Sequence, residues 1–134
     1  MSEAVILVGL QGAGKTTYFQ RHFAATHVHV SRDVLLTAGR EAALIDEHLR
    51  QGRSFVVDNT NATRAVREGY VRAAKAAGFR VVAIYFDANV RTAIGRNNHR
   101  TDKKPIPVPA ILRTAKKLQP PVVDEGFDEV HTAE

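Results

Sequence analysis

The stretch GLQGAGKTT at residues 9–17 constrains the fold of this 134-residue chain more than any other feature. It matches the pattern G-x-x-x-x-G-K-[ST], whose fixed positions are here Gly9, Gly14, Lys15 and Thr16. Glycines let the backbone curl around phosphate oxygens, the lysine brings positive charge to the β- and γ-phosphates, and the threonine hydroxyl reaches Mg²⁺. The motif therefore predicts binding of a nucleoside triphosphate, with Thr16 as a metal ligand. The residues expected against the nucleotide are Gln11, Gly12, Ala13, Gly14, Lys15, Thr16 and Thr17.

The residues on both sides of this loop favour a phosphate site over a chance match in a glycine-rich turn. The run AVILV at 4–8 is continuously apolar, which is typical of a buried parallel strand. The following segment, 15–25, carries its aromatic residues near helical spacing. A helix there would direct the positive end of its dipole at the bound anion.

Apolar runs and helical patterns alternate along the rest of the chain. We expect strands at 27–30, 54–58 and 79–86, and an edge strand at 127–133. We expect helices at 32–52, 63–78, 89–100 and 108–119, with Gly52 ending the first, and with Thr63 capping the second and Gly78 following its end. This alternation predicts one α/β domain over residues 1–134, built on a mostly parallel sheet with helices on both faces. Ligands then bind at the carboxyl ends of the strands.

Composition narrows the class of protein. The chain has no cysteine, which suits a reducing compartment and excludes disulfides and thiol nucleophiles. The first apolar run is too short for a signal sequence or a membrane span, so we expect a cytoplasmic protein with no membrane partner.

The net charge of +5 is unevenly distributed. Residues 91–117, the basic segment, contain eight basic residues and one acid, for a net charge of +7, whereas the rest of the chain is at −2. Such a concentration of charge favours a polyanionic ligand. A solvated helix face together with a lid that touches only the nucleotide explains it equally well.

Three polar clusters follow expected strands and should face the phosphate loop: SRD at 31–33, DNTN at 58–61, and the basic segment. Asp33 fits two roles, a general base for phosphoryl transfer or an N-cap, and the cap is the commoner role for an aspartate where a helix starts. Asp58, Asn59 and Asn61 are side chains that also form ordinary turns.

Two histidines, His27 and His29, alternate along the short strand expected at 27–30. Because the sequence offers no third ligand nearby, we interpret them as packing or surface residues and not as metal ligands.

Six segments, in this order and at these intervals, resemble the kinase module of polynucleotide 5′-kinases: GLQGAGKTTYFQRHF, HVHVSRDVL, VVDNTNATR, RNNHR, IPVPAI and EGFDEV. The resemblance covers nearly the whole chain and is strongest to the kinase half of the animal polynucleotide kinase–phosphatases; it extends to the bacteriophage enzyme. Many unrelated proteins share the phosphate loop, but V-x-R-D together with D-N-T-N is more specific. The resemblance implies a P-loop kinase-type three-layer sandwich with a basic helical lid at about 91–108. It also implies Mg²⁺-dependent transfer of the ATP γ-phosphate to a 5′-hydroxyl of DNA or RNA, as in end healing and repair.

The same resemblance implies roles for individual residues. Asp33 matches the family's general base, and Asp58 matches the acid of the turn that organises the acceptor site. Arg100, together with Arg96, matches the lid arginines that grip ATP. The catalytic residues expected are Lys15, Asp33 and Arg100. The acceptor-binding residues expected are Arg32, Asp33, Asp58, Asn59, Asn61 and Arg64.

The sequence departs from the family at one acceptor position. The bacteriophage enzyme has an arginine three residues beyond its base, where this chain has Leu36. Other cations must hold the acceptor strand, and the candidates are Arg32, Arg64, Lys103 and Lys104.

Two further motifs of nucleic-acid repair enzymes do not occur in the sequence. It contains neither the D-x-D-x-T motif of phosphatases nor the K-x-D-G motif of ligases. We therefore expect a stand-alone kinase module that works with a separate phosphatase or ligase partner.

Two other functions remain open at the level of sequence. The first is a P-loop kinase of a small metabolite or nucleoside, with a closed acceptor pocket; the basic segment and the D-N-T-N turn weigh against it. The second is a non-catalytic nucleotide-binding module. The sequence has no N-K-x-D guanine signature, which disfavours a GTPase switch.

Overall fold

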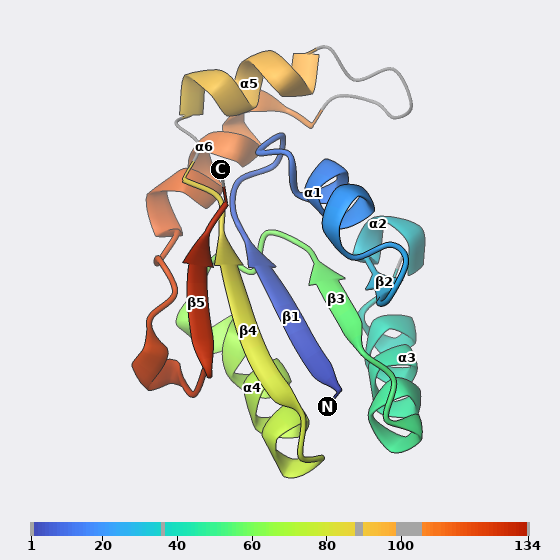
Figure 1. Ribbon diagram of the computed structural model, residues 1–134. Helices are drawn as coiled ribbons and strands as arrows, with labels where there is room; N and C mark the ends of the chain where they lie inside the picture. Colours follow the sequence, from blue (N-terminus) through green and yellow to red (C-terminus); the bar gives the residue numbers. More distant parts are fainter. Residues whose placement is uncertain (1, 36, 88–89, 99–105, 134) are drawn as a thin grey trace.

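The computed structural model describes residues 2–35, 37–87, 90–98 and 106–133. Within these residues a five-stranded sheet is formed by β1 (Glu3–Val8), β2 (Val28–Val30), β3 (Phe55–Asp58), β4 (Arg80–Tyr85) and β5 (Glu129–Thr132). Their spatial order is β2-β3-β1-β4-β5, and every pairing is parallel (Figure 1). The predicted parallel sheet and its edge strand near the carboxyl terminus are confirmed.

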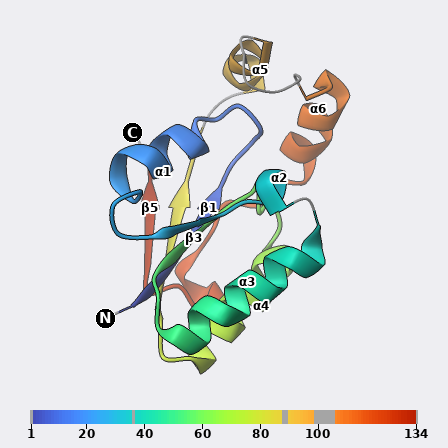
Figure 2. The same cartoon turned by 90° about the vertical axis from the view of Figure 1, so that its right-hand side faces the viewer.

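Helices cover both faces of this sheet. The helices of the described residues are α1 (Lys15–His22), α2 (Arg32–Leu35), α3 (Ala38–Gln51), α4 (Arg64–Ala76), α5 (Val90–Asn98) and α6 (Val108–Lys117), with a 3₁₀ turn η1 at Val123–Glu125. Figure 2 shows α1 on one side of the sheet and α3 and α4 on the other, while α5 and α6 lie beyond the carboxyl ends of the strands. The three-layer arrangement is therefore confirmed. In the described part of the chain no helix is both long enough and apolar enough to cross a membrane.

The expectation of one continuous helix over 32–52 is wrong, because two helices, α2 and α3, occupy this range. Thr37 stands between them in an extended conformation, at φ −134° and ψ 152°. Its hydroxyl accepts a hydrogen bond from the backbone N–H of Arg40 at 3.1 Å, which starts α3 with an N-cap. The apolar periodicity runs through this cap, and so the pattern alone concealed the break.

The expected helix boundaries at three other positions are confirmed. Gly52 ends α3 in the left-handed region at φ 68°, where a side chain would be strained. The Thr63 hydroxyl accepts a hydrogen bond from the backbone N–H of Val66 at 3.3 Å and so caps α4. Gly78 follows the end of α4 at φ 79°.

β1 lies at the centre of the core and is buried on both faces. On one face Ile6 and Val8 pack with Val57 of β3, under α3 and α4. On the other face Leu7 packs with Phe19 of α1. A strand covered on both sides must be apolar at every position, which explains the unbroken run at 4–8. The phosphate loop therefore follows a strand that is buried on both faces.

A buried ion pair connects α4 to the carboxyl-terminal part of the chain. The Arg67 side chain is fully buried, and its guanidinium donates to both carboxylate oxygens of Glu125 at 2.9 and 2.8 Å. It also donates to the backbone oxygens of Asn61 and Gln119, both at 2.9 Å. Burial would raise the pKa of Glu125, but hydrogen bonds from Arg67 and from the Val122 backbone outweigh it and hold this pKa below its ordinary value. Nothing in the local sequence indicated this pair.

Removing the arginine should destabilise the fold strongly. Arg67→Met leaves the Glu125 charge buried without its partner, which typically costs about 3–5 kcal/mol of unfolding free energy. Arg64→Met is the matched control, because the Arg64–Asp124 pair at 2.9 Å is solvent-exposed and such pairs contribute about 0–1 kcal/mol. Urea unfolding of both variants measures the difference. Equal losses in the two variants would contradict the assignment of Arg67 as a structural anchor.

The lowered pKa of Glu125 also predicts a pH dependence. A carboxyl group with a depressed pKa in the folded state stabilises the fold above its ordinary pKa of 4.5, and this contribution is lost as pH falls through the lowered value. The stability difference between the wild type and Glu125→Gln should therefore be largest near neutral pH and shrink in acid. Urea midpoints measured from pH 7 down to pH 3 test it; a constant difference over that range would refute the expectation.

Candidate active site

The phosphate loop adopts the curled geometry that its sequence predicts. Gly12 and Gly14 have φ of 80° and 93°, in the left-handed region, and Gly14 is the N-cap of α1. The ammonium group of Lys15 donates to the backbone oxygens of Gly9 and Leu10, both at 2.8 Å, which folds this side chain back over the loop. The positive charge of Lys15 is thus held at the site where the sequence places the phosphates.

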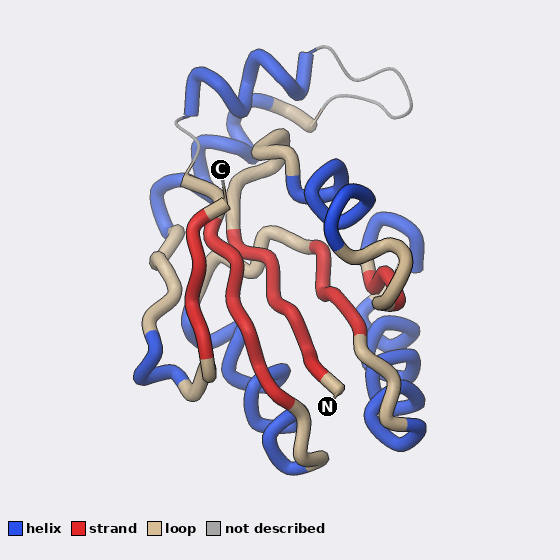
Figure 3. The backbone as a smooth tube through the Cα atoms, in the orientation of Figure 1, coloured by secondary structure: helices blue, strands red, loops and turns tan. Residues whose placement is uncertain are grey.

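Gly9 is required for packing at the base of the loop. A Cβ atom at this position would lie 2.8 Å from the Cβ of Phe86, closer than real Cβ contacts come. The Gly9 N–H also donates to the backbone oxygen of Thr60 at 3.0 Å. The loop after β1 is therefore joined directly to the loop after β3, and Figure 3 shows these two loops side by side at the carboxyl ends of the strands.

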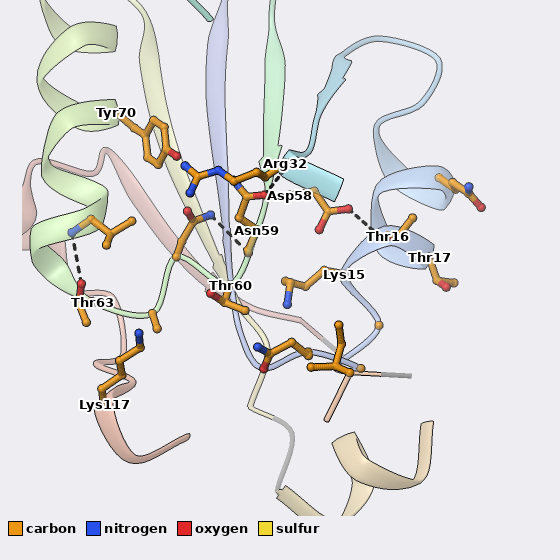
Figure 4. A pocket seen from close by; sticks show the side chains of 18 residues that line it. Lys15, Thr16, Thr17, Arg32, Asp58, Asn59, Thr60, Thr63, Tyr70 and Lys117 are labelled. Atoms are coloured by element: carbon orange, nitrogen blue, oxygen red, sulfur yellow. Dashed lines mark hydrogen bonds between the residues drawn. The ribbon is translucent and has the colours of Figure 1, made fainter. Parts of the chain in front are cut away.

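Asp58, at the end of β3, lies against the phosphate loop. One of its carboxylate oxygens accepts from the Thr16 hydroxyl at 2.8 Å (Figure 4). The same oxygen accepts from His29 Nε2 at 2.7 Å. The His29 ring in turn stacks on Phe19, with the ring centres 4.3 Å apart. Burial would raise the pKa of Asp58, but the hydrogen bonds from His29 and Thr16, together with the charge of Lys15, lower it below its ordinary value. The carboxylate is ionised at neutral pH.

The contact between Asp58 and His29 gives both residues surroundings that the sequence analysis did not predict. Asp58 was expected on the acceptor side, but its described contacts are with Thr16 and His29. His29 does pack against an aromatic ring as expected, but it also carries a polar contact to the site that sequence reasoning missed. Alternation along a three-residue strand could not reveal that contact, since the partner comes from β3. His27 contacts Glu3 at 2.9 Å, away from the loop.

A second network surrounds the buried carboxylate of Glu41, which sequence reasoning did not select. Glu41 is 3% exposed and accepts from Asn59 Nδ2 at 2.7 Å, from Arg32 Nη2 at 3.3 Å, and from the Tyr70 hydroxyl. Asn59 Oδ1 also accepts from the Arg32 backbone N–H at 2.9 Å. Burial and the hydrogen bond to Glu41 both raise the pKa of Tyr70, so its hydroxyl stays protonated and donates. The network fixes Arg32 and Asn59, two of the predicted acceptor residues.

Two other predicted acceptor residues have structural partners. Asn61 is 2% exposed and adopts φ 46°, and its amide donates to the backbone oxygens of Leu7 at 2.7 Å and Val57 at 3.3 Å. It therefore joins the ends of β1 and β3. The exposed Arg64 pairs with Asp124 and does not line the cleft described next.

A cleft of about 790 Å³ joins the phosphate loop to this network. It brings together most of the predicted residues; Ala13 packs into the core instead. Gln20, Val66, Tyr70 and Lys117 are lining residues that sequence reasoning did not select. The full lining is Gln11, Gly12, Gly14, Lys15, Thr16, Thr17, Gln20, Arg32, Asp58, Asn59, Thr60, Asn61, Ala62, Thr63, Val66, Tyr70, Ile106 and Lys117 (Figure 4).

Several predicted positions fall where the structure gives no side-chain description. Asp33 and Arg96 have a described backbone, in α2 and α5, but no described side chain. Because α2 begins at Arg32, Asp33 is its second residue, and the residue before the helix is Ser31; this placement does not favour the N-cap alternative. Four positions lie outside the described residues altogether, as does part of the expected lid: Leu36, Arg100, Lys103 and Lys104.

The fold and the loop together define the class of protein. A phosphate loop between the central strand and the first helix of a parallel sheet is the strand–loop–helix unit of P-loop proteins. With helices beyond the carboxyl ends of the strands, the domain has the P-loop kinase fold. Residues 5–121 match the protein family described as AAA domain, and the chain belongs to that family.

Comparison with known proteins extends this assignment. The chain is 28% identical over 132 residues to the bifunctional polynucleotide phosphatase/kinase of Schizosaccharomyces pombe, covering 96% of this chain and 32% of that protein. It thus spans about a third of the length of that relative.

Two solved structures share the fold. Chaetomium thermophilum Kti12 in complex with ADP-AlF3 has a TM-score of 0.73 at 17% identity, covering 97% of this chain and 88% of that chain. A gluconokinase from Sinorhizobium meliloti has a TM-score of 0.64 at 16% identity, covering 97% and 81%. At these identities the two structures bear on the fold alone.

The close contact at Gly9 predicts a specific defect in nucleotide binding. Gly9→Ala should displace the phosphate loop from Phe86 and weaken binding of a fluorescent ATP analogue by roughly tenfold or more, since the loop amides must converge on the phosphates. Gly69→Ala is the control: it lies within α4 with no atom within 4 Å of its added Cβ, and it should stabilise the fold by about 0.5–1 kcal/mol. Unchanged nucleotide affinity in Gly9→Ala would contradict the claim that the close approach to Phe86 requires glycine at this position.

Proposed function

We propose that this domain transfers the γ-phosphate of ATP to the 5′-hydroxyl of DNA or RNA ends. The observation that carries the proposal is the meeting of three segments in one cleft: the phosphate loop, Arg32 next to Asp33, and the D-N-T-N turn. These belong to three of the six segments on which the resemblance to polynucleotide kinases rests. The kinase named in the Schizosaccharomyces pombe relative supports the same substrate class.

The donor half of the cleft fits ATP with Mg²⁺. The Thr16 hydroxyl and the ionised Asp58 carboxylate are 2.8 Å apart and are hard oxygen donors of the kind that Mg²⁺ prefers. Thr16 and Asp58 would hold the ion, which when bound supplies positive charge to the β- and γ-phosphates. Lys15 adds its own charge from the loop, and His29 orients the Asp58 carboxylate. We further propose that the lid arginines, Arg96 and Arg100, bind the ATP.

The acceptor half supplies the base and the orientation. Asp33 accepts the proton of the 5′-hydroxyl as the bond between that oxygen and the γ-phosphorus forms. The bond from the γ-phosphorus to the β,γ-bridging oxygen breaks at the same time, and ADP leaves. Because the transition state is loose, positioning and charge stabilisation contribute most of the rate. Arg32 and Asn59, both fixed by Glu41, are the groups that position the acceptor.

A direct transfer assay tests the proposal. The protein is incubated with γ-labelled ATP and one of four acceptors: a 5′-hydroxyl oligonucleotide, its 5′-phosphorylated counterpart, a free nucleoside, or gluconate. We expect label only in the 5′-hydroxyl oligonucleotide. Label in the nucleoside or in gluconate alone would support a metabolite kinase instead, and ATP binding without transfer to any acceptor would indicate a non-catalytic module.

Lys15→Ala should abolish transfer and leave the fold intact. The Lys15 ammonium contacts loop backbone oxygens and faces the cleft, so its loss removes charge from the phosphate site without opening the core. Transfer rate and melting temperature are the two readouts. An active Lys15→Ala enzyme would disprove the P-loop role of this residue.

Asp33→Asn separates the base from the cap. Asparagine caps a helix as well as aspartate does, so a cap would lose little on this change. A general base typically contributes about 10²–10⁴-fold, so turnover should fall at least about 100-fold with the melting temperature unchanged. If the asparagine variant turns over at the wild-type rate, Asp33 is not the base.

A further inference from the structure

We propose that the acceptor half of the cleft contains a nucleobase subsite. Its wall is formed by Val66 and the ring of Tyr70 on α4, and Lys117 at the end of α6 contacts the phosphate that follows the terminal nucleoside. The subsite deepens the proposed function and rests on it, because it says how a strand end is distinguished from a small acceptor.

The apolar wall is exposed inside an otherwise polar cleft. Val66 is 52% exposed although it lines the cleft, so its methyl groups face solvent where a ligand would sit. Tyr70 lies four residues further along α4, and side chains at this spacing are neighbours on one helix face. The cost of leaving this apolar surface in water is recovered when a flat apolar ligand covers it.

The wall is also held rigid. The Tyr70 hydroxyl donates to Glu41, which is itself buried and bonded to Asn59 at 2.7 Å. On the other side, the Thr63 hydroxyl fixes the backbone at Val66 through the α4 cap. Because these side chains are already ordered, they lose little conformational entropy when a base packs on them. Less of the contact free energy is then spent on ordering the site, and more of it contributes to affinity.

The charge around the wall suits a phosphodiester strand. Arg32 and Lys117 line the cleft from two different elements, and Figure 4 shows Arg32 beside the Tyr70 ring and Lys117 near Thr63. Among the described lining residues Asp58 alone is acidic, and its carboxylate is held by Thr16 and His29. No described carboxylate forms a salt bridge with Lys117, whereas Arg64 is already paired with Asp124. We therefore assign Lys117 as the cation of this half of the cleft that contacts the strand.

A small polar acceptor fits this half of the cleft poorly. A sugar acid presents hydroxyl groups on most of its carbons, and each buried hydroxyl needs a hydrogen-bond partner. Val66 offers none. A nucleobase instead presents a flat face to the wall and keeps its polar edge toward solvent, and it brings a phosphate on its 3′ side for Lys117.

The test compares two 5′-hydroxyl oligonucleotides that differ only at the terminal residue, one with a base and one abasic. Contacts to one base typically change affinity by between about 5-fold and about 100-fold, so the wild type should prefer the base-containing end in kcat/KM by an amount in that range. Val66→Ser removes the apolar surface and should reduce this preference several-fold. Tyr70→Leu should do the same. Val123→Ser, which changes a 61% exposed valine in η1 outside the cleft, is the matched control and should keep the preference.

The role of Lys117 has its own measurement. Each phosphate contact to a single strand contributes about 0.7 to the slope of log affinity against log salt. Lys117→Ser should reduce the slope for the oligonucleotide by about that amount and leave the KM for ATP unchanged. Lys116→Ser removes another exposed lysine on the same helix that does not line the cleft, and the slope should not change.

The outcomes separate the subsite from the proposed function. No transfer to any 5′-hydroxyl oligonucleotide would overturn the proposed function, and the subsite with it. Transfer with equal kcat/KM on the two oligonucleotides would overturn the subsite alone. A preference that survives in both Val66→Ser and Tyr70→Leu, with the KM for ATP normal, would also overturn it. Loss of the preference in those two variants but not in Val123→Ser supports it.

Discussion

The shared carboxylate of Asp58 is the contact on which the rest of the site depends. A single buried oxygen accepts from Thr16 in the first turn of α1 at 2.8 Å and from His29 of β2 at 2.7 Å, so one charge at the end of β3 joins α1, β2 and β3. An isolated carboxylate in this position would be costly, because desolvation penalises its charged form. The two donors and the nearby Lys15 lower the pKa of Asp58 and offset that cost. The same arrangement leaves oxygen donors beside the phosphate loop, where a metal-bound nucleotide needs them.

Much of the fold was predictable because it follows from periodicity. The unbroken apolar run at 4–8, the alternation of strands and helices, and the caps at Thr63 and Gly52 are local signals, and each corresponds to an observed element. The location of the site followed from topology, since parallel strands bring their carboxyl ends to one edge. The phosphate loop, Arg32 and the D-N-T-N turn therefore meet in one cleft, as expected from their places after β1, β2 and β3.

The contacts that organise the cleft were not predictable from sequence, because they depend on buried polar pairs. Glu41, Tyr70 and Arg67 stand within helices where the same residue types are usually solvated, and nothing local distinguishes them. Tyr70 and its partner Glu41 are 29 residues apart in the sequence. Arg67 and its partner Glu125 are 58 residues apart. The break at Thr37 was missed for a related reason. The apolar periodicity continues across this residue, so only the structure shows that α2 ends before Thr37 and that Thr37 caps α3.

The carboxyl-terminal part of the chain supports the wall of the cleft formed by Val66 and Tyr70, although the family match ends at residue 121. Gln119 donates its backbone N–H to Ala62 at 2.7 Å, and its side-chain oxygen accepts from the backbone N–H at the start of α4 at 2.8 Å. Arg67 then ties the same turn to Glu125. Lys117 stands two residues before Gln119, so the position of this lysine and the position of the wall are set by the same hydrogen bonds. Under the proposed subsite, we therefore expect a loss of Glu125 to reduce both stability and strand binding, and a loss of Lys117 to reduce strand binding alone.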